Sequence, residues 1–94
     1  MKYITWNAEK NIQLIQERGI SFERVIQHIE KKELLAIIQH PNPLKYPNQR
    51  MFILNINNYA YLVPFVENDK EIFLKTIIPS RKATKKYLGI NNDY

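Results

Sequence analysis

The sequence predicts one α+β domain in which two N-terminal helices pack on one face of an antiparallel sheet. A clear helical stripe near the N-terminus and a run of short alternating strands in the second half predict these two layers. The length of 94 residues, with 45% apolar residues, suits a single modest core. The expected element order is β-α-α-β-β-β-β-α with a short C-terminal helix. We expect the domain to span residues 1–90 and a tail to occupy residues 91–94.

The N-terminal elements follow from capping residues and from periodicity. KYITW at residues 2–6 predicts a short strand, and Asn7 is placed to cap a helix over residues 8–18, which Gly19 ends. Ser21 is a second candidate N-cap, for a helix that we expect to reach about residue 32. The apolar stripe of this second helix recurs at i, i+3, i+4 and i+7 and consists of Phe22, Val25, Ile26 and Ile29.

The second half of the chain is predicted to be mostly strands. ELLAIIQH predicts a buried strand, with a continued helix as the alternative, and the proline-rich PNPLKYPN after it predicts a loop. Three meander strands follow, RMFILNI, AYLVPFVE and EIFLKTII, joined by turns at Asn57-Asn58 and within VENDKE. We expect Pro79 to stop the last strand, Ser80 to cap the last helix and Gly89 to end that helix.

Strand alternation assigns a face of the sheet to each side chain in the meander. Two-residue loops at Asn57-Asn58 and Asn68-Asp69 would set the register, so that Phe65 opposes Ile72. Lys75 then lies on the open, mixed face, and a one-residue slip in either turn would reverse this assignment. The face expected to receive the two helices carries Phe52, Leu54, Ile56, Tyr61, Val63, Phe65, Ile72, Leu74 and Ile78.

Composition and charge narrow the classes of partner and chemistry. The formal net charge is +5, which points to a polyanionic partner such as nucleic acid, an anionic membrane surface or an acidic protein, unless the chain is simply a basic globular protein. The absence of cysteine excludes disulfides, thiolate chemistry and cysteine-ligated zinc, and we expect no cofactor. No apolar segment resembles a signal peptide or a membrane span, so we expect a cytoplasmic protein without a membrane partner.

A cluster of cations closes the predicted domain. Arg81, Lys82, Lys85 and Lys86 follow Lys75 in IIPSRKATKKYLG, a stretch that contains no acid. Several of these cations lie near a predicted helix N-terminus, whose backbone N–H groups also attract anions. Ala83 and Tyr87 share a stripe that can lie on the sheet. We therefore expect the cations of the last strand and the last helix to converge on a shared hollow.

Two segments of the chain resemble BrnT-type toxins. The first is Trp6-Asn7-Ala8-Glu9-Lys10-Asn11 followed by Gly19-Ile20-Ser21-Phe22, and the second is Ser80-Arg81-Lys82-Ala83-Thr84-Lys85-Lys86. The resemblance covers most of the domain. It implies a RelE-like fold and a metal-independent endoribonuclease that cleaves RNA. It also implies a cognate antitoxin, often a small DNA-binding protein of the ribbon-helix-helix type, which neutralises the toxin in a hetero-oligomer.

The candidate site residues follow from the chemistry of such a nuclease. The ribose 2′-hydroxyl attacks the adjacent phosphorus, and the protein must stabilise charge on the phosphate oxygens. We expect Lys75, Arg81 and Lys85 to be catalytic, with Arg81 as the phosphate clamp because its fork binds two oxygens. His40 is the one plausible histidine general base, although an exposed loop histidine without a role is the plainer interpretation. The expected RNA-binding residues are Arg50, Lys82, Lys86 and Tyr87.

Two other functions remain open from the sequence. The BrnT-type pattern usually has Lys-His before the glycine, whereas this chain has Glu17-Arg18, and the PNPLKYPN loop is an addition to the pattern. These departures favour a non-catalytic module of the same fold that binds nucleic acid or a protein. A structural subunit could instead use the mixed face of the sheet, including Met51 and Phe73, for protein contacts.

Overall fold

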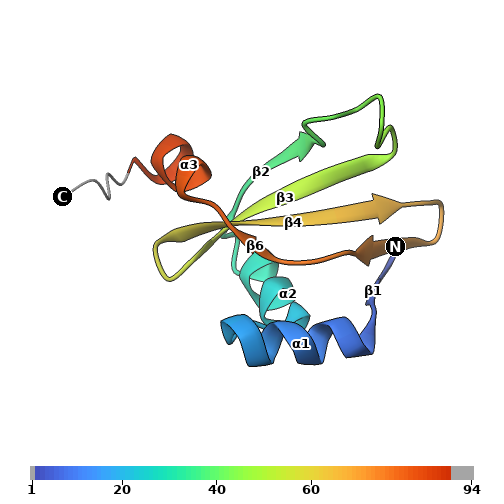
Figure 1. Ribbon diagram of the computed structural model, residues 1–94, viewed down its shortest axis with the longest axis horizontal. Helices are drawn as coiled ribbons and strands as arrows, with labels where there is room; N and C mark the ends of the chain where they lie inside the picture. The colour runs from blue at the N-terminus through green and yellow to red at the C-terminus, as the bar shows by residue number, and fades with distance from the viewer. Residues whose placement is uncertain (1, 90–94) are drawn as a thin grey trace.

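The computed structural model describes residues 2–89, and the tail predicted at residues 91–94 lies outside this range. The predicted α+β class is confirmed: α1 and α2 cover one face of a sheet, and α3 lies on the other face, as Figure 1 shows. The helical elements of the described chain therefore sandwich the sheet between them. This arrangement leaves the face that carries α3 only partly covered.

The N-terminal elements form where the sequence predicts them. Strand β1 (Tyr3–Trp6) leads into helix α1 (Ala8–Arg18), and the side chain of Asn7 caps α1 by accepting the N–H of Lys10 at 2.9 Å. Gly19 ends α1 in the left-handed conformation with a φ of 69°. These predicted ends of α1 are confirmed. The local sequence was enough to predict them, because caps depend on interactions within one turn of the chain.

Helix α2 (Phe22–Glu30) is slightly shorter than predicted. Ser21 caps it, since its Oγ accepts the N–H of Arg24 at 3.1 Å. The helix ends at Glu30 because Lys32 takes a left-handed φ of 62° and turns the chain into strand β2 (Leu34–Gln39). The alternative of a continued helix through ELLAIIQH is therefore wrong.

The predicted hairpin at Asn57-Asn58 is confirmed. It joins β3 (Gln49–Ile56) to β4 (Tyr59–Glu67), and both asparagines have positive φ, at 55° and 63°. Ile56 opposes Tyr59, as a two-residue loop requires. The inward and outward faces of β3 and β4 are consequently those that alternation predicts.

The next turn lies one residue later than predicted, and the register of β5 (Glu71–Leu74) differs. Phe65 opposes Leu74, whereas the sequence analysis paired it with Ile72. The register prediction was wrong because the N–H of Asn68 donates to the carbonyl of Glu71 at 3.0 Å, so the two-residue loop is Asp69-Lys70 and not Asn68-Asp69. The shift amounts to two residues, so the side chains of β5 keep their predicted faces.

The predicted strand EIFLKTII is interrupted. It continues as β6 (Ile78–Pro79), which pairs with β4 so that Leu62 opposes Ile78. One extra residue therefore stands between the β5 register and the β6 register, which is a bulge over residues 75–77. The bulge places Ile77 in the core at 0% exposure and leaves Ile78 at 39%, so the prediction that Ile78 faces the helices was wrong.

The sheet is mixed, which corrects the expectation of a wholly antiparallel one. Its order is β1-β5-β4-β3-β2, with β6 beside β4. β1 runs parallel to β5, and Tyr3 opposes Glu71. The helices and the meander between these two strands provide the long crossover that a parallel pair needs.

The main core lies between the sheet and α1–α2. Trp6 belongs to it, with its ring stacked 5.7 Å from that of Phe22, centroid to centroid. A smaller apolar cluster lies on the opposite face, beneath α3. The buried side chains of the main core are Leu14, Ile20, Phe22, Val25, Phe52, Leu54, Ile56, Val63, Phe65, Leu74 and Ile77.

Candidate nucleic-acid interface

The last helical segment begins and ends as predicted, but its final turn is wide. Helix α3 (Arg81–Ala83) is capped by Ser80, whose Oγ accepts the N–H of Ala83 at 3.1 Å. It continues as the π-helical turn η1 (Thr84–Leu88), which Gly89 ends with a φ of 66°. π-helical turns are rare and occur frequently at functional sites.

Two backbone-anchored contacts hold this segment on the sheet. The buried hydroxyl of Thr84 accepts the N–H of Ala60 at 2.9 Å and donates to the carbonyl of Ser80 at 2.7 Å. The N–H of Ser80 donates to the carbonyl of Ala60 at 3.0 Å. Ala83 packs below with Ile53. The side chains of α3 and η1 are therefore held in a defined position over β3 and β4.

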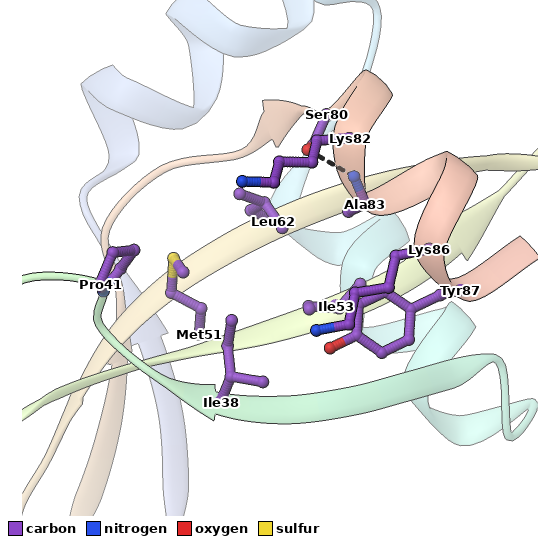
Figure 2. Close-up of a pocket in the computed structure, with 10 residues that line it drawn as sticks. All are labelled: Ile38, Pro41, Met51, Ile53, Leu62, Ser80, Lys82, Ala83, Lys86 and Tyr87. Atoms are coloured by element: carbon purple, nitrogen blue, oxygen red, sulfur yellow. Dashed lines mark hydrogen bonds between the residues drawn. The ribbon is translucent and has the colours of Figure 1, made fainter. Parts of the chain in front are cut away.

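A hollow of about 210 Å³ lies between this segment and the open face of the sheet. Figure 2 shows an apolar floor from the strands, with Pro41 on the rim across from Tyr87. The wall is formed by α3, η1 and the cap residue. The lining residues are Ile38, Pro41, Met51, Ile53, Leu62, Ser80, Lys82, Ala83, Lys86 and Tyr87.

The hollow is positively charged. Lys82 extends over Leu62, and the ammonium of Lys86 lies beside the Tyr87 side chain, 5.4 Å from the ring centroid (Figure 2). No lining residue of the hollow is an acid. The sequence also contains no Asp or Glu in residues 34–66 or 72–89, which supply every lining residue. An anion that enters meets two ammonium groups and no carboxylate within the lining.

The structure brings together three of the predicted RNA-binding residues. Lys82, Lys86 and Tyr87 all line the hollow. Tyr87 also packs against the apolar cluster beneath α3, so its packing role and its place in the hollow coexist. The expectation that Ala83 and Tyr87 share a stripe on the sheet is confirmed.

The predicted catalytic residues lie outside the lining. Lys75 is exposed, and its N–H donates to the carbonyl of Pro64 at 2.8 Å, which extends the β4–β5 ladder by one pair. Pro64 also opposes Met51, so Lys75 lies on the same face as the hollow, as predicted. Arg81 and Lys85 are exposed on α3 and η1 but do not line the hollow. The predicted convergence of all these cations on one hollow is thus met only by Lys82 and Lys86.

Arg50, predicted to bind RNA with these lysines, lies elsewhere. It opposes Phe65 on the face that carries α1 and α2, with its guanidinium carbon 5.3 Å from the Phe65 ring centroid. It also forms an ion pair with Glu67, which accepts a second bond from Lys2 at 2.6 Å. The bonds from Lys2 and then Arg50 lower the pKa of the Glu67 carboxyl. Arg50 therefore belongs to a charge pair on the opposite face of β3 and not to the hollow.

His40, the candidate general base, forms a hydrogen bond and a ring contact within the loop after β2. Nδ1 of His40 accepts the N–H of Asn42 at 3.0 Å, and the imidazole packs against Tyr46. His40 does not line the hollow, and no lining residue is a histidine, aspartate or glutamate. The sequence analysis placed Met51 on this open face, but the fact that Met51, Ile38 and Leu62 form the floor of a hollow depends on the position of α3 above them.

Comparisons with protein-family models, curated proteins and solved structures find no match to this chain. In residues 2–89, no group of three or more His, Cys, Asp or Glu side chains is arranged to hold a metal ion. None of the helices in that range combines the length and the apolar character that crossing a bilayer requires.

Proposed function

We propose that this chain is a cytoplasmic endoribonuclease of the RelE-like, BrnT-type class, the toxin of a type II toxin–antitoxin pair, which cleaves RNA without a metal ion. One observation carries the proposal: Lys82, Lys86 and Tyr87 line a single hollow, and none of its lining residues among the described residues 2–89 is an acid. The two motifs that resemble BrnT-type toxins add to it. RNA supplies the negative charge and the flat bases that such a hollow suits.

The chemistry that the hollow would support is an internal transfer. The ribose 2′-oxygen forms a bond to the adjacent phosphorus while the bond from phosphorus to the 5′-oxygen breaks. One proton leaves the 2′-hydroxyl and one is taken up by the 5′-oxygen, which gives a 2′,3′-cyclic phosphate and a 5′-hydroxyl. Lys82 and Lys86 would stabilise the charge that develops on the phosphate oxygens, and the Tyr87 hydroxyl would orient the ribose.

The remaining predicted catalytic cations would act on neighbouring phosphates. Arg81 and Lys85 are exposed on the same short helical segment, and Lys75 lies on the same face of the sheet. A single strand that crosses the hollow would pass its flanking phosphates close to this face. Arg81 remains the candidate clamp, because a guanidinium can bind two phosphate oxygens at once.

A cognate antitoxin would neutralise the toxin by covering the same face. The floor of the hollow is apolar and its rim is cationic, so an acidic segment with apolar side chains would complement both. A small DNA-binding partner, often of the ribbon-helix-helix type, would fit this role in a hetero-oligomer. Its addition should block cleavage in proportion to complex formation.

A non-catalytic RNA-binding or protein-binding module is the second candidate. The specific observation that favours it is that no histidine, aspartate or glutamate lines the hollow, so no ordinary general base stands where the 2′-hydroxyl proton would leave. Such a module would bind RNA through the same lysines and leave it intact.

The deciding experiment incubates the purified chain with end-labelled single-stranded RNA in excess chelator. We expect products that end in a 2′,3′-cyclic phosphate, and we expect the Lys82→Ala/Lys86→Ala variant to lose cleavage. Lys70→Ala, in the β4–β5 turn, removes an exposed lysine away from the hollow and should leave cleavage unchanged. RNA that is bound but uncut would favour the non-catalytic RNA-binding module. RNA that is neither bound nor cut would reject the nuclease and the RNA-binding module and would favour the protein-binding module.

A further inference from the structure

The loop between β2 and β3, residues 40–48, is held in one conformation by its own hydrogen bonds. Asn42 is the centre of this network: its N–H donates to His40 Nδ1 at 3.0 Å, and its Oδ1 accepts the N–H of Lys45 at 3.3 Å. The carbonyl of Asn42 accepts the N–H of Tyr46 at 3.0 Å. Three prolines restrict the loop further. A loop ordered in this way presents its side chains in a fixed arrangement.

The loop presents a pair of rings with a cation beside it. The imidazole of His40 and the ring of Tyr46 lie 4.4 Å apart, centroid to centroid, at an interplanar angle of 41°. The ammonium of Lys45 lies 5.4 Å from the Tyr46 ring centroid. Both rings are only half-buried, and residues 40–48 contain no acid. Part of each ring is therefore accessible from solvent in positively charged surroundings.

Strand register places this pair on the face that carries the hollow. Ile38 lines the hollow and opposes Met51. The N–H of His40 donates to the carbonyl of Gln49 at 3.0 Å, which continues the β2–β3 ladder past Ile38 by two residues. Side chains two residues apart share a face, so His40 lies on the same face as Ile38.

Pro41 connects the ring pair to the hollow. It directly follows His40 and lines the hollow on the rim opposite Tyr87, as Figure 2 shows. Pro41 thus borders the apolar floor on the side opposite Tyr87, and the ring pair of the same loop lies beyond Pro41, outside the lining. A flexible polyanion that occupies the hollow and extends past Pro41 would reach Tyr46 next.

We propose that Tyr46, supported by His40 and Lys45, forms a second nucleotide subsite for single-stranded RNA. A base stacks on the exposed part of the Tyr46 ring, and Lys45 contacts the adjoining phosphate. His40 supports the tyrosine from its other side, and because its Nδ1 accepts the Asn42 N–H, the neutral imidazole carries its proton on Nε2. This subsite rests on the proposed function, since it extends the RNA path that begins at Lys82 and Lys86.

The RNA at this subsite must be single-stranded, because a base can stack on the Tyr46 ring only when it is unpaired. Bases in an RNA duplex are stacked on one another, and their faces are closed to a protein side chain. Aromatic stacking beside cationic side chains is the usual way to bind single strands without strict sequence preference. We therefore expect duplex RNA of the same length to bind more weakly than the single strand.

The test is a binding titration with a fluorescein-labelled single-stranded RNA whose 2′-O-methyl groups prevent cleavage. Tyr46→Ala should weaken binding by about 5- to 160-fold, the range for the loss of one base stack, whereas Tyr46→Phe should retain most of the affinity. Tyr59→Ala is the matched control. Tyr59 is also half-buried and lies 5.8 Å from the ring of Tyr61, but it opposes Ile56 on the α1–α2 face. Its loss should leave binding unchanged, and thermal melting of each variant checks that it folds.

The outcomes separate this subsite from the proposed function. If Tyr46→Ala binds as tightly as the wild type while Lys82→Ala binds more weakly, the subsite is rejected and RNA binding at the hollow stands. If duplex RNA binds as tightly as the single strand, base stacking at Tyr46 is likewise rejected. If the wild type binds no RNA, the subsite and the proposed function are both rejected.

Discussion

Arg18 donates a hydrogen bond of 3.2 Å from Nη1 to the carbonyl oxygen of Ile77, which joins the end of α1 to the bulge between β5 and β6. The bulge frees this carbonyl from the regular ladder, and a buried or half-buried carbonyl needs a partner. Arg18 therefore has a structural role at the end of α1. The bond also ties the helix layer to the strand that leads into α3.

The bulge makes neighbouring isoleucines unequal in their contribution to stability. Ile77→Ala should lower the free energy of unfolding by about 2–5 kcal/mol, because it removes a fully buried side chain and leaves a cavity. Ile78→Ala, the matched control at 39% exposure, should cost about 1 kcal/mol or less. Urea denaturation measures both. A larger loss for Ile78 than for Ile77 would contradict the bulge.

The position of α3 on the sheet depends on the hydroxyl of Thr84. Thr84→Val keeps the shape of the side chain but leaves the N–H of Ala60 without its partner, and Thr84 is 0% exposed. We expect a loss of about 1–3 kcal/mol in the free energy of unfolding. Thr84→Ser keeps the hydroxyl and should lose less. Equal stability of the valine and serine variants would show that the hydroxyl does not hold the segment.

The contact between Asn11 and Glu23 predicts a pH response. The side-chain N–H of Asn11 donates to Glu23 at 2.8 Å and is the main cause of the lowered pKa of that carboxyl. A carboxyl whose pKa is lower in the folded state stabilises the fold above its unfolded pKa. This contribution is lost as the pH falls through the folded pKa. Thermal melting of Glu23→Gln between pH 7 and pH 3 should show a weaker decline than the wild type.

Asn11→Asp should reverse the sign of this response. The new carboxylate can still accept the N–H of Phe22, but it faces Glu23 and raises the pKa of the pair. At neutral pH we expect a loss on the order of 1 kcal/mol, because Glu23 is exposed and solvent screens the repulsion. The deficit relative to the wild type should shrink as the pH falls from 7 towards 4. A deficit that stays constant over this range would contradict the prediction.

The salt dependence of RNA binding distinguishes the cations of the hollow from Arg50. Each phosphate contact to a single strand contributes about −0.7 to the slope of log K against log salt concentration. Lys82→Ala/Lys86→Ala should therefore reduce the magnitude of that slope by about 1.4. Arg50→Ala should leave the slope unchanged, because Arg50 pairs with Glu67 on the opposite face. An Arg50 effect equal to that of the lysines would show that RNA binds the other face.

Local signals correctly predicted the starts of α1 and α2, the end of α1 and the central hairpin. Asn7, Gly19 and Ser21 act within one turn of chain, and Asn57-Asn58 sets its hairpin through its own positive φ angles. Alternation then assigned β3 and β4 to the correct faces, because a two-residue turn leaves no freedom of register. The sequence also predicted the cations on the last helical segment correctly, because the charge of a segment follows directly from its residue types.

Tertiary packing decided everything that depends on how distant segments meet. The bulge over residues 75–77, the parallel pairing of β1 with β5, and the separation of Arg50 from the α3 lysines arise from contacts between residues far apart in the chain. Such contacts shift a strand by one residue or reverse its partner without any change in local propensity. The hollow exists for the same reason: its floor and its lysines come from segments at least twenty residues apart, from Leu62 to Lys82, and the bond between the Thr84 hydroxyl and the Ala60 amide holds them together.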